Sequence, residues 1–218
     1  RLLLAAAVAL VVSLVGTKAL INWLTSHKIG QPIREDGPQG HVTKAGTPTM
    51  GGIAIVVGAF AGWVVSDLYH GVYTRTGIFV MAAIIGSAMV GLLDDWLKVV
   101  RERNLGLNKR AKSIGLLAVA IAFGIVMVSG TDVHTTISFT RWDSFGFEIG
   151  KTLWVVWAVF LISGFSNAVN LTDGLDGLAS GAAILAFAAY MFIAFWQFRH
   201  EDVYAVAHAL DIAVIAAS

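Results

Sequence analysis

The 218-residue chain is 57% hydrophobic and carries charged side chains at 13% of its positions, about half the proportion of roughly 25% in soluble domains. This composition excludes an ordinary soluble enzyme and a disordered chain, which needs high charge and low hydrophobicity. The sequence contains no cysteine, which excludes a disulfide scaffold. Its net charge of +1 excludes a global basic surface for nucleic acid. The class that remains is an all-α polytopic membrane protein.

Seven apolar runs are predicted to be transmembrane helices, because a span requires about 20 mostly apolar residues. A cleaved signal peptide is the alternative for the first run, although no small-residue cleavage pattern follows it. The sequence begins at Arg1 and stops within an apolar run, so we interpret it as one incomplete transmembrane domain, 1–218. The predicted helices are roughly Leu2–Leu24, Gly51–Leu68, Gly77–Leu93, Ile114–Val128, Leu153–Val169, Leu178–Phe195 and Val203–Ala217.

The loops between these runs alternate in charge. The first, third and fifth loops together hold nine lysine and arginine residues, and the other three hold four. The positive-inside rule therefore places the odd-numbered loops in the cytoplasm. In the fourth loop, the alternating segment 134–140, the turn residues 143–146 and the return segment 147–149 predict a small β-hairpin on the outer face. An irregular loop is the alternative there.

The third apolar run ends in two adjacent carboxylates, Asp94 and Asp95. A helix C-terminus favours cations, so the pair is unfavourable unless something positive compensates it. A divalent cation or the basic loop that follows could do so, and carboxylates near a membrane are usually functional. The alternative is a solvated helix end where Lys98 pairs with the carboxylates at i,i+3 and i,i+4 spacing.

The fifth loop is rich in oxygen ligands and has no positive charge. Asn167 and Asn170 are three residues apart, as are Asp173 and Asp176, so each pair would share a face if helical. Carboxylates suit Mg²⁺, which often binds through one or two of them and the oxygens of a phosphate. The alternative is a short turn capped by these residues, but capping accounts for only one or two of them.

The first loop leads into the second helix with a lysine, hydroxyl groups and two glycines. Lys44 and Thr49 lie just before that helix, and a helix N-terminus with such neighbours can bind an anion. The glycine spacing matches neither the P-loop nor the dinucleotide fingerprint, and Thr49 as a simple N-cap is the alternative. Together the three odd-numbered loops offer what phosphoryl transfer requires, and their place in a membrane suggests a lipid substrate.

At these motifs the sequence resembles the polyprenyl-phosphate N-acetylhexosamine-1-phosphate transferase superfamily, and within it the phospho-N-acetylmuramoyl-pentapeptide transferases. The 167–178 motif is specific for the superfamily, and the run Thr47–Gly52 points to the muramoyl branch. The resemblance is carried by Asp36–Pro38, Lys44–Gly52, Gly91–Asp95 and Asn167–Leu178.

The resemblance implies a ten-helix protein of the bacterial cytoplasmic membrane, often dimeric, with its active site on the cytoplasmic face. The implied reaction transfers phospho-MurNAc-pentapeptide from UDP-MurNAc-pentapeptide to undecaprenyl phosphate. It requires Mg²⁺, releases UMP and gives lipid I for peptidoglycan synthesis. The superfamily's later motifs, a further metal-binding aspartate and a histidine-rich loop, would follow Ser218, so we expect the 218 residues alone to be inactive.

By motif position, Asp94 and Asp95 look like the catalytic carboxylates and the metal ligands. The residues that look like the region holding the nucleotide-sugar are Lys44, Thr49, Asn167, Asn170, Asp173 and Asp176. A UDP-N-acetylglucosamine:polyprenyl-phosphate transferase is the alternative within the class. A cation-coupled transporter is the alternative from another class, but it should carry ionisable groups near mid-helix. A purely structural bundle leaves the composition of 167–178 unexplained.

Overall fold

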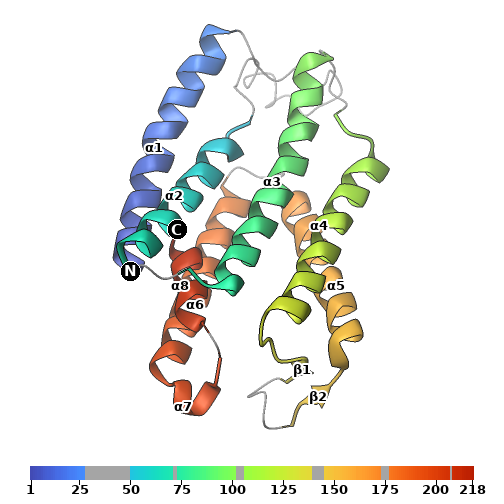
Figure 1. Ribbon diagram of the computed structural model, residues 1–218. Helices are drawn as coiled ribbons and strands as arrows, with labels where there is room; N and C mark the ends of the chain where they lie inside the picture. The colour runs from blue at the N-terminus through green and yellow to red at the C-terminus, as the bar shows by residue number, and fades with distance from the viewer. Residues whose placement is uncertain (28–49, 71–72, 102–105, 139–144, 173–176, 207) are drawn as a thin grey trace.

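The computed structural model describes residues 1–27, 50–70, 73–101, 106–138, 145–172, 177–206 and 208–218 (Figure 1). Over these residues it is a helical bundle with one small sheet, so the predicted fold class is confirmed. The helices are α1 Leu2–Ser26, α2 Gly52–His70, α3 Arg75–Val100, α4 Lys109–Gly130, α5 Gly150–Thr172, α6 Leu178–Arg199, α7 Glu201–Tyr204 and α8 Ala209–Ala217; the strands are β1 Thr136–Ile137 and β2 Phe147–Glu148.

Six helices, α1 to α6, are long and apolar enough to cross a membrane, among the residues described. They coincide with the first six predicted runs but extend further into polar sequence. The side chain of Asn108 accepts a hydrogen bond from the Ala111 amide (2.7 Å) and caps α4, which begins five residues before Ile114. Thr74 caps α3 in the same way, accepting from the Gly77 amide at 3.0 Å.

The seventh prediction, one continuous helix over Val203–Ala217, is wrong in its first half. Helix α7 ends at Tyr204, and α8 begins only at Ala209. Between them, Ala205 (φ 46°) and His208 (φ 62°) adopt left-handed backbone conformations that cannot continue a right-handed helix. The chain reverses direction there, and α8 runs back along α6 and against α1 (Figure 1).

The predicted hairpin is confirmed. β1 and β2 pair antiparallel, with Thr136 opposite Glu148 and Ile137 opposite Phe147. The amide of Ile149 extends the pairing by donating to the Thr135 carbonyl (3.0 Å). The hairpin connects α4 to α5 at the lower end of the bundle in Figure 1.

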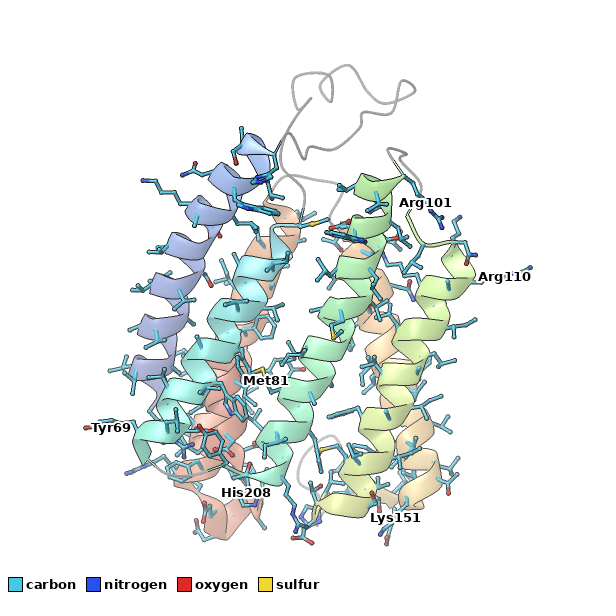
Figure 2. All side chains as sticks on the ribbon, turned by 45° about the horizontal axis from the view of Figure 1, so that its top comes forward. Tyr69, Met81, Arg101, Arg110, Lys151 and His208 are labelled. Atoms are coloured by element: carbon cyan, nitrogen blue, oxygen red, sulfur yellow. The ribbon has the colours of Figure 1, made fainter. Side chains whose placement is uncertain are left out.

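Few apolar side chains lie inside the bundle. Its buried centre is the small cluster of Ala5, Trp63, Met81 and Val214, and Figure 2 shows Met81 in the middle of the bundle. Most other apolar side chains project outward. In α5, for example, Ala158 is the only buried residue. Such outward apolar faces are costly in water but match a lipid environment, which agrees with a multi-pass membrane protein.

Helices α1 and α2 pack at backbone distance because α2 has glycines where they meet. A Cβ added at Gly58 would lie 2.0 Å from the hydroxyl oxygen of Ser13, and one at Gly62 would lie 2.6 Å from the carbonyl oxygen of Ala5. Glycines four residues apart facing small residues are typical of close helix contacts in membranes.

A buried ion-pair network joins α1, α2 and α8 near the lower end of the bundle. A guanidinium nitrogen of Arg1 lies 2.5 Å from Oδ1 of Asp67 and 2.9 Å from Oδ1 of Asp211. The hydroxyl of Thr74 donates to the other oxygen of Asp211. Asp67 and Asp211 are completely or almost completely buried, so these contacts replace part of the water that both carboxylates have lost. Sequence reasoning did not pair these two aspartates.

We predict that Gly62→Ala destabilises the bundle by about 1–3 kcal/mol, because the added methyl group overlaps the backbone of α1. The matched control is Gly164→Ala in α5, where nothing lies within 4 Å of the added Cβ. That variant should be neutral or gain up to about 1 kcal/mol of helix propensity. Unfolding in increasing dodecyl sulfate, followed by circular dichroism, measures both. Equal stability of the two variants would contradict the close contact.

Asp211→Asn should lower the free energy of unfolding by about 3 kcal/mol, because it leaves the Arg1 guanidinium with one fewer anionic partner in a buried site. Asp202→Asn in α7 removes the same charge from an exposed position and should change stability by less than about 0.5 kcal/mol. The same denaturant titration compares them. A loss no larger than that of the control would show that the network does not hold α8 in place.

Candidate functional site

The segments that carry the predicted site residues all connect at one end of the bundle. In Figure 1, α1, α3 and α5 end toward the top, and α2, α4 and α6 begin there. Figure 2 shows Arg101 and Arg110 at this end, and Lys151 and His208 at the other. The described helix ends that flank the first, third and fifth loops therefore lie at one end of the bundle, as the charge pattern predicted.

Among the residues that the structure describes, Asp94 is the most enclosed charged group at this end, with its side chain 12% exposed. Its Oδ1 accepts a hydrogen bond from the backbone amide of Leu107 (2.8 Å). Its Oδ2 lies 2.9 Å from the ammonium of Lys98 and 3.9 Å from that of Lys112. Both carboxylate oxygens therefore have partners, and these come from α3, α4 and the segment that precedes α4.

Lys98 holds the two adjacent carboxylates together. Its ammonium lies 2.8 Å from Oδ1 of Asp95 and 2.9 Å from Oδ2 of Asp94. These are the i,i+3 and i,i+4 pairs that the sequence offered as the alternative to a bound cation, so a lysine supplies the positive charge in this structure. The side chain of Asp95 is 30% exposed, which makes it the more accessible carboxylate.

Gly106 closes the site over Asp94. A Cβ added at Gly106 would lie 2.4 Å from Oδ1 of Asp94 and 2.5 Å from its carbonyl oxygen, so only glycine fits there. This contact sets up the hydrogen bond from the next amide, that of Leu107. Sequence reasoning missed both Gly106 and Lys112. The only available signal was their position in the basic loop that follows the carboxylates.

The two asparagines lie in the last turns of α5, which continues to Thr172. Asn167 and Asn170 are therefore three residues apart on one helix, and both are exposed. The side-chain amide of Asn167 donates to the carbonyl of Ser163 (2.9 Å). Among the described residues, no hydrogen bond or ion pair joins the asparagines to the carboxylates.

Four predicted site residues lie outside the described residues: Lys44, Thr49, Asp173 and Asp176. Gly177, which follows that segment, has φ of 79° and directly precedes α6. Only glycine adopts this conformation readily, which agrees with the tight turn expected near it.

For a cation, the described residues offer the Asp94 and Asp95 carboxylates but no group of three or more histidine, aspartate and glutamate side chains. Two carboxylates are few for Ca²⁺, but they agree with the way Mg²⁺ is bound when a phosphate ligand completes its shell.

A model of glycosyl transferase family 4 matches residues 77–217, which is well over half of the chain. The chain belongs to glycosyl transferase family 4. A shorter match covers residues 44–56 and is described as phospho-N-acetylmuramoyl-pentapeptide-transferase signature 1. The family match includes α3 with the carboxylate pair, and the signature match includes Lys44 and Thr49.

Curated relatives of this family cover the whole sequence. A phospho-N-acetylmuramoyl-pentapeptide-transferase of Streptomyces avermitilis is 42% identical over 237 residues, which span 100% of this chain and 66% of the relative. Those of Corynebacterium efficiens (41%; 100% and 66%) and Frankia casuarinae (43%; 99% and 64%) are similar. The chain thus spans about two thirds of the length of these family members.

Gly106→Ala should raise the hydrogen-exchange rate of the Leu107 amide about fivefold, because the added methyl group displaces the carboxylate that accepts its hydrogen bond. The control is Gly181→Ala in α6, where the added Cβ has no neighbour within 4 Å. Exchange followed by mass spectrometry of the peptides that cover 106–112 is the measurement. Unchanged exchange in Gly106→Ala would mean that Asp94 does not hold this segment.

Proposed function

We propose that the protein containing this chain transfers phospho-MurNAc-pentapeptide from UDP-MurNAc-pentapeptide to undecaprenyl phosphate. The products are lipid I and UMP, for peptidoglycan synthesis. The observation that carries the proposal is the Asp94–Asp95 pair with Lys98 at the bundle end where the signature match over 44–56 leads into α2. The names of the similar family members support the choice of substrate.

The chemistry of the cluster supports phosphoryl transfer. Such reactions depend on positioning the reactants and neutralising phosphate charge. Lys98 and Lys112 place two ammonium groups within 4 Å of Asp94, so the carboxylates and the cations occupy one small region. Its place at the end of an apolar bundle suits a lipid phosphate in the membrane and a nucleotide-sugar in water. The positive-inside rule assigns this end to the cytoplasm.

In the proposed mechanism, Asp94 or Asp95 accepts the proton of undecaprenyl phosphate. The lipid phosphate oxygen then attacks the sugar-linked phosphorus of UDP-MurNAc-pentapeptide, a new P–O bond forms, and the bond to UMP breaks. In a double displacement, one aspartate would instead attack the same phosphorus first, so that UMP leaves and the phospho-MurNAc-pentapeptide is bonded to the carboxylate; the lipid phosphate would then displace the aspartate. Trapping that covalent enzyme would exclude the direct route.

Asp94 and Asp95 would hold Mg²⁺, whose preferred oxygen ligands they provide. The ion supplies positive charge that offsets the pyrophosphate when bound. Lys98 contacts both carboxylates in this structure. For the ion to bind, the ammonium of Lys98 would have to move away or share the carboxylates with it. We assign the nucleotide-sugar to the residues of the first and fifth loops: Lys44, Thr49, Asn167, Asn170, Asp173 and Asp176.

Asp94→Asn and Asp95→Asn, each in the full-length protein, should lower turnover at least about 100-fold, since each removes a proton acceptor and a negative charge. UMP release from UDP-MurNAc-pentapeptide, with undecaprenyl phosphate and Mg²⁺ present, measures this. The control is Asp202→Asn on the exposed helix α7 at the other end, which should keep normal turnover. Near-normal turnover in both site variants would refute the assignment.

The same assay separates the rival functions. Replacing the donor by UDP-N-acetylglucosamine tests the other branch of the superfamily. This donor should support little or no UMP release by the full-length protein. A transporter would release no UMP. A transporter is also expected to carry ionisable groups near the middle of its helices. The two buried, paired carboxylates described here, Asp67 and Asp211, lie instead in the end turns of α2 and α8.

A further inference from the structure

A cavity of about 740 Å³ opens at the end of the bundle opposite the carboxylate pair. It lies between the start of α3, the end of α4, β1, the end of α6, α7 and the start of α8. Figure 2 shows His208, one of its lining residues, at this lower end. Its volume is within the range of about 300–1,000 Å³ that is typical of ligand sites.

The lining of the cavity is polar for a membrane bundle. It includes Arg75, His134, Tyr204, His208 and several hydroxyl side chains, with Asp132 as its carboxylate. Among the described residues, neither Arg75 nor His208 makes an ion pair or a side-chain hydrogen bond. An arginine presents five N–H donors in a fork that matches the oxygens of a phosphate or carboxylate. Arg75 and His208 therefore offer hydrogen-bond donors to the cavity that no other described residue uses.

The buried carboxylate behind the cavity is paired within the protein. Asp211 is engaged by Arg1 and by the hydroxyl of Thr74, and it is only 2% exposed. The same threonine caps the N-terminus of α3, and α8 begins beside it at Ala209. The N-terminus of α3 thus brings a partial positive charge to this wall, whereas the first turn of α8 contains Asp211. The first turn of α3 holds no acidic residue.

We propose that this cavity is a second site, separate from the carboxylate pair, and that it binds a phosphate group. Arg75 is its charged anchor, and His208 offers a further hydrogen-bond donor. The phosphate could belong to a free anion or to the head group of a lipid, because the cavity lies at an end of a membrane bundle.

Cysteine protection tests this proposal, since the chain has no cysteine of its own. A single-cysteine full-length protein carrying T136C, in the cavity lining, is labelled with a water-soluble maleimide in maltoside micelles. One arm adds inorganic phosphate, and the other adds phosphatidylglycerol. Chloride at equal ionic strength is the reference for both. At ligand concentrations near ten times the dissociation constant, labelling should slow about tenfold. Protection in the first arm alone identifies a free anion, and protection by the lipid identifies a head group.

Matched variants locate the effect. R75Q in the T136C background should abolish protection, whereas K151Q, an equal charge loss outside the cavity at the same end, should retain it. A cysteine at the exposed Ser26, at the opposite end, should label at the same rate with or without phosphate. Absence of protection in both arms, or equal protection in R75Q and K151Q, overturns the proposal. The T136C result itself does not depend on either variant folding.

Discussion

The cost of placing a charge within an apolar bundle determines where the polar side chains of this chain lie. An ionised group away from water requires a partner of opposite charge and filled hydrogen bonds. At one end, Lys98 satisfies Asp94 and Asp95 together. At the other, Arg1 satisfies Asp67 and Asp211. The two clusters differ in access, because the carboxylates of the second are buried whereas Asp95 remains partly open to solvent. That difference is the physical reason for placing chemistry at the first cluster and a structural role at the second.

Features that depend on local sequence could be predicted from it. The apolar runs identified α1 to α6, and alternation identified the hairpin. The spacing of Lys98 from the aspartates gave their pairing only as the alternative to a bound cation. Features that depend on distant residues could not. The break between α7 and α8 contains no proline or glycine at its described residues, and it accompanies the burial of Asp211 against α1 and α3. Lys112 and Gly106 join the site only because α4 returns beside α3.

The helices also differ in how much of their surface is buried against other helices. α1 and α2 approach closely through Gly58 and Gly62, with small residues on the facing helix. By contrast, α5 and α6 bury only Ala158 and Ala194 respectively among the described residues. The proposed nucleotide-sugar ligands Asn167 and Asn170 lie on α5, so this part of the site is supported by fewer contacts than Asp94 is. The contact between α1 and α2 is therefore closer than any that the described residues of α5 make around the two asparagines.

The hydrogen bond from Leu107 to Asp94 links the charge of one side chain to the path of the backbone between α3 and α4. A ligand that draws Oδ1 of Asp94 toward itself must compete with that amide, and loss of the bond loosens the segment that begins at Gly106. By thermodynamic reciprocity, a change in the position of this segment must also change the affinity of Asp94 for its ligand. Ligand binding at the carboxylate pair is thus thermodynamically coupled to the ordering of the backbone that begins at Gly106.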